Sequence, residues 1–159
     1  MEVIRGKTAM LFEASTHSAA VLAGAGAEQA ESLRQFGDAL GMAFQLVDDL
    51  LDYRGDAATL GKNVGDDLAE GKPTLPLIAA MRDGTPEQAS LVRKAIQQGG
   101  SQDLEGIRAA VESAGALDYT AQLARDYAAR AIACLDTLPA NAYRDALVEL
   151  TEFAVARTH

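Results

Sequence analysis

Three carboxylates with helical spacing, Asp48, Asp49 and Asp52, stand at the polar end of an apolar run. On a helix, Asp48 and Asp52 project from one face about one turn apart, and Asp49 flanks that face. Such like charges repel unless a cation lies between them, and oxygen-only clusters suit Mg²⁺. Because Mg²⁺ keeps several waters and completes its shell with substrate phosphates, the spacing predicts a metal-bridged phosphate or diphosphate site.

The approach to these acids is almost wholly apolar. It contains Leu40, Met42, Phe44, Leu46 and Val47. A helix that is this apolar is buried, so we expect its acidic end to open into a cavity. The alternative interpretation is a solvated helix end that binds nothing.

Glycine and proline mark residues 61–77 as a loop that follows the acids. Lys62 and Lys72 are each preceded by glycine, which lets the backbone approach a ligand closely. A lysine ammonium neutralises phosphate as a point charge. Pro73 fits the first turn of a new helix, whose N-terminus would also favour an anion. We expect Asp66 and Asp67 to support these two lysines by ion pairing. The alternative is a flexible surface linker with ordinary charges.

Helical periodicity recurs along the chain, and no strand alternation competes with it. We therefore expect an all-α helical bundle that forms a single domain over residues 1–159. Gly37 and Gly41 are four residues apart on the buried helix and indicate a close helix crossing. The expected helices lie at about 2–23, 27–54, 73–82, 86–98, 101–114, 117–137 and 140–157.

Composition narrows the possible partners and compartments. The net charge of −9 argues against nucleic acid and against anionic membrane surfaces. A single cysteine, Cys134, rules out an intrachain disulfide and suits a reducing cytoplasm. No apolar run approaches the roughly 20 residues that span a bilayer, so we expect a cytoplasmic chain without stable membrane insertion.

The order of the motifs resembles one known family. Gly-Lys-Thr-Ala stands at 6–9, Phe-Gln-Leu-Val-Asp-Asp-Leu-Leu-Asp-Tyr at 44–53 and Gly-Lys-Asn-Val-Gly-Asp-Asp-Leu-Ala-Glu-Gly-Lys-Pro-Thr-Leu-Pro-Leu at 61–77. This order resembles the C-terminal half of the trans-polyprenyl diphosphate synthases, and most of all the bacterial octaprenyl diphosphate synthases of quinone side-chain synthesis. The likeness covers essentially the whole chain and implies the isoprenoid synthase fold.

The resemblance also implies roles for the matching residues. Asp48, Asp49 and Asp52 match the second aspartate-rich motif of the family, which binds Mg²⁺ bridging the allylic diphosphate. The positions that match diphosphate contacts are Lys7, Thr8, Gln45, Lys62 and Lys72. In the family, metals and cations draw off the diphosphate, the double bond of isopentenyl diphosphate attacks the allylic carbocation, and a proton is lost.

The sequence departs from the family pattern in one respect. The family needs two aspartate-rich motifs on facing helices, and this sequence carries one. Asp66 and Asp67 do not make a second motif, because Glu70 stands three residues after Asp67, where a third aspartate would be needed. The first motif and the isopentenyl diphosphate pocket would lie before residue 1. We therefore expect an incomplete synthase domain that is inactive alone, from a parent that acts as a homodimer.

Two other functions stay open. The chain could be a non-catalytic or complementary subunit of a heteromeric prenyltransferase, or a relative of the terpene cyclases. The intact set of three aspartates and both loop lysines favours a synthase over a regulatory subunit, which could lose them. The loop at 61–77 favours a synthase over a cyclase, because it matches synthases specifically.

Overall fold

The computed structural model describes residues 1–54, 66–98 and 103–157, and every regular element in these ranges is a helix. The all-α prediction is therefore confirmed. None of these helices is long and apolar enough to cross a bilayer. The elements are α1 (Glu2–Ile4), the π-helix η1 (Arg5–Ala9), α2 (Met10–Leu22), α3 (Ala27–Arg54), α5 (Asp66–Ala69), α6 (Leu75–Asp83), α7 (Pro86–Gln98), α8 (Leu104–Ser113), α9 (Ala116–Cys134), the 3-10 helix η2 (Leu135–Thr137) and α10 (Ala142–Ala156).

The helices form two compact units, and the division between them falls inside both α3 and α9. The first unit comprises Met1–Val47 and Leu123–Arg157, and the second comprises Asp48–Gln122. Each unit has its own hydrophobic core. The expectation of a single domain over residues 1–159 stays a prediction.

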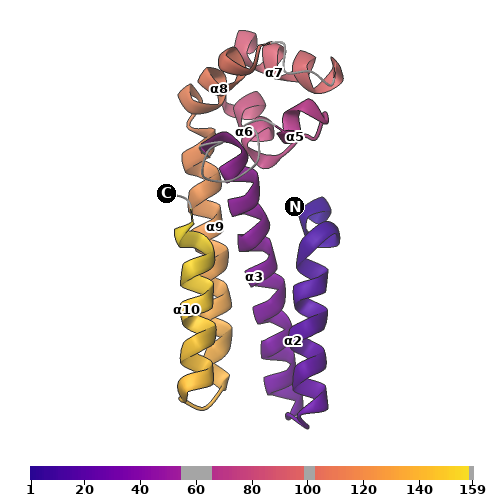
Figure 1. The fold of residues 1–159 in the computed structure, drawn as a ribbon, viewed down its shortest axis with the longest axis vertical. Helices are drawn as coiled ribbons and strands as arrows, with labels where there is room; N and C mark the ends of the chain where they lie inside the picture. The colour runs from indigo at the N-terminus through magenta and orange to yellow at the C-terminus, as the bar shows by residue number, and fades with distance from the viewer. Residues whose placement is uncertain (55–65, 99–102, 158–159) are drawn as a thin grey trace. The chain divides into compact units, whose positions relative to one another are not determined.

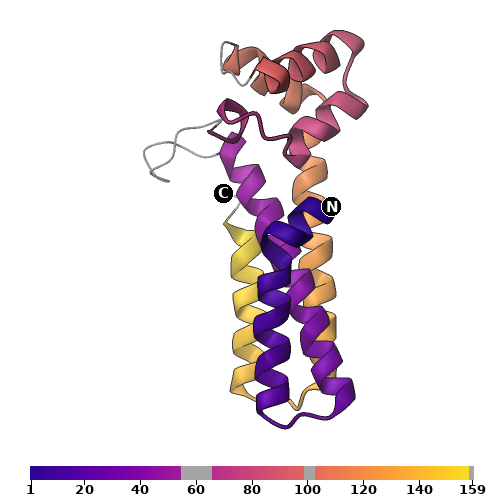
Figure 2. The ribbon, with the colours of Figure 1, turned by 90° about the vertical axis from the view of Figure 1, so that its right-hand side faces the viewer.

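In the first unit, α2, the first part of α3, the later part of α9 and α10 run lengthwise beside one another (Figures 1 and 2). Side chains from these helices and from η2 meet in one core. Its buried members include Phe36, Leu40, Ala131, Leu135 and Ala154. Phe36 and Leu40 belong to the apolar stripe of α3 that the sequence predicts to be buried.

Two glycines allow α3 to lie close against the first helical segment. A Cβ atom at Gly41 would lie 2.6 Å from the Cα of Ala9, and one at Gly37 would lie 2.5 Å from the carbonyl oxygen of Phe12. Real Cβ atoms do not approach backbone this closely, so only glycine fits at both positions. The predicted close helix crossing is confirmed.

In the second unit, α6, α7 and α8 pack on one another (Figure 1). Their core also includes side chains from the end of α3 and the start of α9. Buried members include Leu50, Tyr53, Leu77, Ile107 and Leu117. The helix α7 begins at Pro86 as predicted, and Thr85 and Gln88 exchange two hydrogen bonds of 2.8 and 3.3 Å across its first turn.

The structure corrects some of the predicted boundaries. The segment predicted as a loop contains the short helix α5, and α6 begins after Thr74, so Pro76 rather than Pro73 lies in its first turn. The chain turns after α5 at Gly71, which has a φ of 70°. The backbone N–H of Gly71 donates a 2.9 Å hydrogen bond to the carbonyl oxygen of Leu68. These boundaries depend on hydrogen bonds that a periodic pattern does not reveal.

Candidate metal and diphosphate site

The three predicted metal ligands all lie on α3, as the sequence indicates. Asp48 and Asp52 are partly buried, whereas Asp49 is 4% exposed. Burying a carboxylate costs free energy unless hydrogen bonds or cations compensate. The helix turns Leu50 and Tyr53 into the core of the second unit, and this anchors the turn that carries the acids.

These carboxylates fit Mg²⁺ as part of a mixed coordination shell. Among the residues described, no three His, Cys, Asp or Glu side chains are grouped closely enough to hold a metal ion. Mg²⁺ commonly takes one or two carboxylates and fills its shell with waters and phosphate oxygens. The donor type therefore suits Mg²⁺ bound together with a phosphate-bearing ligand, rather than a closed protein cage.

In the first unit, the structure brings together two of the predicted diphosphate-binding residues. The hydroxyl of Thr8 donates a 2.6 Å hydrogen bond to Oε1 of Gln45, which is 4% exposed. This bond joins η1 to α3 across 37 residues of sequence. It fixes the orientation of the Gln45 amide, because a buried amide gains most from a fixed polar partner.

The predicted helix at 2–23 is interrupted by a wide turn. Residues Arg5–Ala9 form the π-helix η1, which includes both Lys7 and Thr8. Such turns are rare and occur frequently at functional sites. The Lys7 side chain is exposed, and nothing in the residue types of this segment distinguishes a π turn from an ordinary helix.

Lys72 is held by two acidic neighbours. Its Nζ lies 3.1 Å from Oδ1 of Asp67 and 2.5 Å from Oε2 of Glu70. The Glu70 carboxylate first, and then Asp67, raises the pKa of Lys72, so the ammonium stays charged. The predicted pairing of Lys72 with Asp67 is confirmed, whereas Lys62 and the side chain of Asp66 lie outside the described residues.

The environment of Tyr53 shows a polar feature that the sequence does not reveal. Its side chain is 1% exposed and packs in the core of the second unit. Burial raises the pKa of Tyr53, the Thr74 hydroxyl opposes that rise, and the charges of Asp52, Asp67 and Asp49 add to it. Tyr53 and Thr74 therefore lie among the acids of the second unit. The sequence feature that could have indicated this polar environment is the position of the tyrosine directly after the acidic motif.

The chain matches the family model described as polyprenyl synthetase over residues 1–114. It is 52% identical over 157 residues to the all-trans-nonaprenyl-diphosphate synthase (geranyl-diphosphate specific) of Rhodobacter capsulatus, with 99% of this chain and 48% of that protein covered. It is also 52% identical over 158 residues to the octaprenyl diphosphate synthase of Escherichia coli (strain K12), with 99% and 49% covered.

A similar fold occurs in a solved structure. The polyprenyl synthase from Caulobacter crescentus CB15, complexed with calcium and isoprenyl diphosphate, matches with a TM-score of 0.90 and 46% identity. The match covers 99% of this chain and 49% of that one. The chain thus spans about half the length of the relatives that it matches. Since the family model matches well over half of this sequence, the chain belongs to the polyprenyl synthetase family.

Proposed function

We propose that this chain supplies the metal- and diphosphate-binding part of a trans-polyprenyl diphosphate synthase whose product is a long polyprenyl diphosphate, octaprenyl in the first instance. The observation that carries the proposal is the acidic turn of α3, where Asp48, Asp49 and Asp52 offer oxygen ligands and Asp49 is nearly buried. Relatives at 52% identity are named as octaprenyl and nonaprenyl diphosphate synthases, which supports a long product.

In the proposed reaction, the bond from the allylic carbon to the diphosphate oxygen breaks, and its electron pair leaves with the diphosphate. The double bond of isopentenyl diphosphate forms the new carbon–carbon bond, and a proton is then lost. We propose Asp48, Asp49 and Asp52 as the residues that hold Mg²⁺. When bound, the metal supplies positive charge where the leaving diphosphate develops negative charge.

Other residues of each unit would act on the diphosphate directly. In the first unit, we propose that Lys7 neutralises phosphate charge and that Thr8 orients the Gln45 amide through its hydrogen bond. In the second unit, Lys72 would move from its acidic partners to a phosphate, which carries more negative charge. Lys62, outside the described ranges, is proposed for the same role by resemblance.

We propose further that the parent enzyme takes an allylic prenyl diphosphate and isopentenyl diphosphate, acts as a homodimer and works in the cytoplasm. The relative from Caulobacter crescentus is complexed with calcium and isoprenyl diphosphate. Calcium and magnesium are both hard cations that prefer oxygen ligands, which supports Mg²⁺ here. The net charge of −9 argues against nucleic acid as a partner.

The test is calorimetric titration of Mg²⁺ and inorganic diphosphate into this chain and its variants. We expect Mg²⁺-dependent diphosphate binding by the wild-type chain, weakened by about tenfold or more in Asp48→Ala and in Asp52→Ala. Asp118→Ala is the matched control, because Asp118 is an exposed acid of the same unit whose partner is Arg54, 2.7 Å away. Unchanged binding in both α3 variants would remove these aspartates from the metal site.

Turnover tests the rest of the proposal. In an assay with Mg²⁺, farnesyl diphosphate and labelled isopentenyl diphosphate, we expect no product from this chain, because it carries one aspartate-rich motif. In a full-length parent, we expect long-chain product and its loss in Asp48→Ala and Asp52→Ala. Product from this chain alone would show that one motif is sufficient.

A further inference from the structure

Two buried hydroxyls face one another in the second unit. Tyr53 lies near the end of α3 and is 1% exposed, and Thr74 directly precedes α6. In the part of the chain that the structure describes, neither the Tyr53 hydroxyl nor the Thr74 hydroxyl completes a hydrogen bond, and both oxygens are shielded from bulk solvent. The Thr74 hydroxyl is nevertheless close enough to act on the ionisation of Tyr53.

The orientation of Thr74 is unusual for its position. Thr74 is the N-cap residue of α6, where a threonine side chain normally accepts a hydrogen bond from a backbone N–H of the first turn, yet it makes no such bond. By contrast, the side chains of Asp103 and Asn141 do cap α8 and α10. The Thr74 hydroxyl therefore does not cap α6, and it lies beside Tyr53, whose ionisation it affects.

A buried hydroxyl that lacks a partner is costly, and proteins commonly satisfy such groups with ordered internal water. A water molecule is stable in a buried site when two or more polar groups surround it. The requirement for polar partners is met here, because two buried hydroxyls without a hydrogen bond lie beside one another.

We propose that one ordered water molecule binds to the hydroxyls of Tyr53 and Thr74, and that this link makes both residues positioning residues for the acidic end of α3. The link ties the turn that carries Asp52 to Thr74, which precedes α6 and lies two residues after Lys72. The water link stands on the burial of both hydroxyls and on their closeness, whereas its effect on the metal rests on the proposed function. Residues behind metal ligands influence affinity because they hold the ligands in place.

The link itself is tested by structure and by unfolding. We expect a high-resolution crystal structure of this chain to show a water within hydrogen-bonding distance of both hydroxyls. Tyr53→Phe and Thr74→Val should each lower Tm by about 2–4 °C. The double variant should lose little more than the worse single variant, because either change removes the same water. Thr74→Ser keeps the hydroxyl and should retain the wild-type Tm within about 1 °C.

Two matched variants control for the loss of any hydroxyl in this unit. Thr120 is fully buried and donates a 2.8 Å hydrogen bond to the carbonyl oxygen of Ala116. Tyr119 is exposed and lies under the Arg82 guanidinium. Thr120→Val removes a buried threonine hydroxyl and Tyr119→Phe removes an exposed tyrosine hydroxyl, and neither hydroxyl belongs to the proposed link. Their Tm changes should simply add to that of Tyr53→Phe.

The positioning role is tested by Mg²⁺ titration in the presence of inorganic diphosphate. We expect Tyr53→Phe and Thr74→Val each to weaken Mg²⁺ binding about tenfold, Thr74→Ser to restore it, and Thr120→Val and Tyr119→Phe to leave it unchanged. A merely structural role would lower Tm in all these valine and phenylalanine variants without this selective loss of affinity.

Each outcome decides a separate part of the inference. Absence of a water at both hydroxyls, or Tm losses that add in the double variant, would overturn the link. A water with coupled Tm losses but unchanged Mg²⁺ affinity would overturn the positioning role. If the wild-type chain binds no Mg²⁺ with diphosphate, the proposed function fails and the positioning role falls with it, while the unfolding results still decide the link.

Discussion

The hydrogen bond from Thr8 to Gln45 makes the geometry of one proposed diphosphate-binding residue depend on another. Thr8→Val removes the donor and leaves the Gln45 oxygen without that bond in a buried setting. We expect the free energy of unfolding to fall by about 1 kcal/mol, measured by urea denaturation. Thr16→Val is the control, since the Thr16 hydroxyl bonds, within the described ranges, to carbonyl oxygens of its own helix, and we expect a smaller loss there. Equal losses would contradict the prediction.

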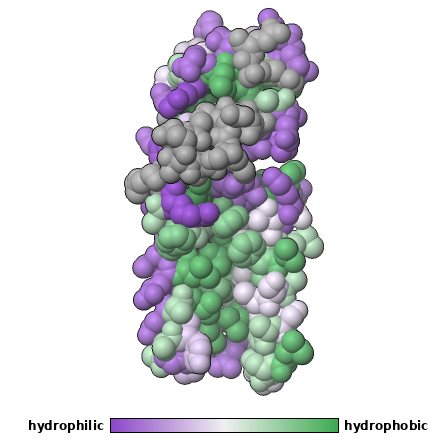
Figure 3. All heavy atoms as spheres, viewed as in Figure 1, coloured by the Kyte–Doolittle hydropathy of each residue, from purple (hydrophilic) through white to green (hydrophobic). Residues whose placement is uncertain are grey.

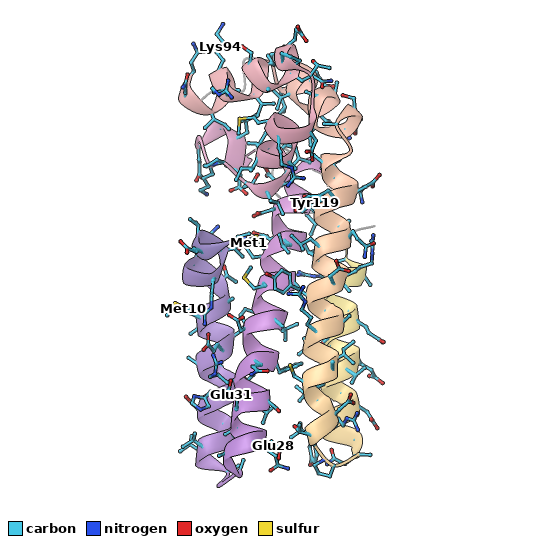
Figure 4. All side chains as sticks on the ribbon, turned by 180° about the vertical axis from the view of Figure 1, so that it is seen from behind. Met1, Met10, Glu28, Glu31, Lys94 and Tyr119 are labelled. Carbon is cyan, nitrogen blue, oxygen red and sulfur yellow. The ribbon has the colours of Figure 1, made fainter. Side chains whose placement is uncertain are left out.

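The ion pair of Glu31 should make the stability of the fold depend on pH in the acid range. The Arg34 guanidinium, helped by the Gln35 amide, lowers the pKa of Glu31 from 4.5 to about 2 (Figure 4 labels Glu31). Because the folded-state pKa is depressed, the stabilisation is fully present above about pH 4.5 and is lost as the pH falls through about 2. Glu31→Gln should therefore lose less stability than the wild type between these pH values.

The measurement for Glu31 is the urea midpoint followed from neutral pH down to about pH 2. Glu28→Gln is a suitable control, because Glu28 is an exposed acid on the same helix with no ion pair among the residues described. Since both partners of the Glu31 pair are solvated, the effect should be small. Parallel curves for Glu31→Gln and the wild type would contradict the assigned pair.

The sequence predicted contacts between near neighbours better than those between distant residues. Lys72 and Asp67 are five residues apart, and their pairing follows from local spacing. The Thr8–Gln45 hydrogen bond spans 37 residues. The resemblance to a family could therefore assign both residues to diphosphate binding, but it could not predict that they bond to each other. The approach of Thr74 to Tyr53 depends on where α6 begins, and the predicted boundary placed Thr74 inside that helix.

Because α3 crosses close to the first helical segment at Gly41, even an alanine side chain at this position should destabilise the fold. In Gly41→Ala, the new Cβ would lie 2.6 Å from the backbone of Ala9, so the helices must separate. We expect a loss of about 1–3 kcal/mol in the free energy of unfolding, by urea denaturation. In Gly6→Ala, nothing lies within 4 Å of the new Cβ, and we expect no loss or a gain of up to about 1 kcal/mol.

Long regular helices were predictable, and interrupted ones were not. The expected helices at 27–54 and 86–98 match α3 and α7, since each carries an uninterrupted apolar stripe. The expected helix at 2–23 contains η1, because the number of residues in one turn changes without any proline or polar signal. The expected helix at 101–114 begins at Leu104, where the Asp103 carboxylate accepts a 3.0 Å bond from the backbone N–H of Gly106.

Several large apolar side chains of the first unit are exposed. Leu11 is 73% exposed, Leu22 is 88% exposed, and Figure 3 shows apolar residues gathered along this unit. Surface of this kind marks association sites. We expect concentration-dependent self-association in sedimentation velocity, reduced by the combined Leu11→Gln and Leu22→Gln changes. Ile78→Gln, an exposed apolar residue of the second unit, should leave it unchanged. A strictly monomeric wild type would contradict the prediction.

The fold class was predictable for the chain as a whole because periodicity near 3.6 recurs and strand alternation is missing from the pattern. The division into two units was not, because it falls at Val47 and Asp48 within one continuous helix. A helix whose stripe continues unbroken gives no indication that its two ends belong to different cores. The boundary is revealed by which distant residues share a core, as Leu50 and Leu77 do in the second unit.

The π-helix η1 also makes the segment Arg5–Ala9 sensitive to insertions and deletions. Arg5 Nη2 lies 2.9 Å from Oε2 of Glu13, eight residues later. In an ordinary α-helix, eight residues make about 2.2 turns, which would rotate the two side chains apart by about 80°. The wider turn of η1 absorbs about one residue, so the two side chains return to the same side. Deleting a single residue from Arg5–Ala9 would therefore displace Arg5 from Glu13, and the length of this segment is more tightly constrained than its amino-acid identities.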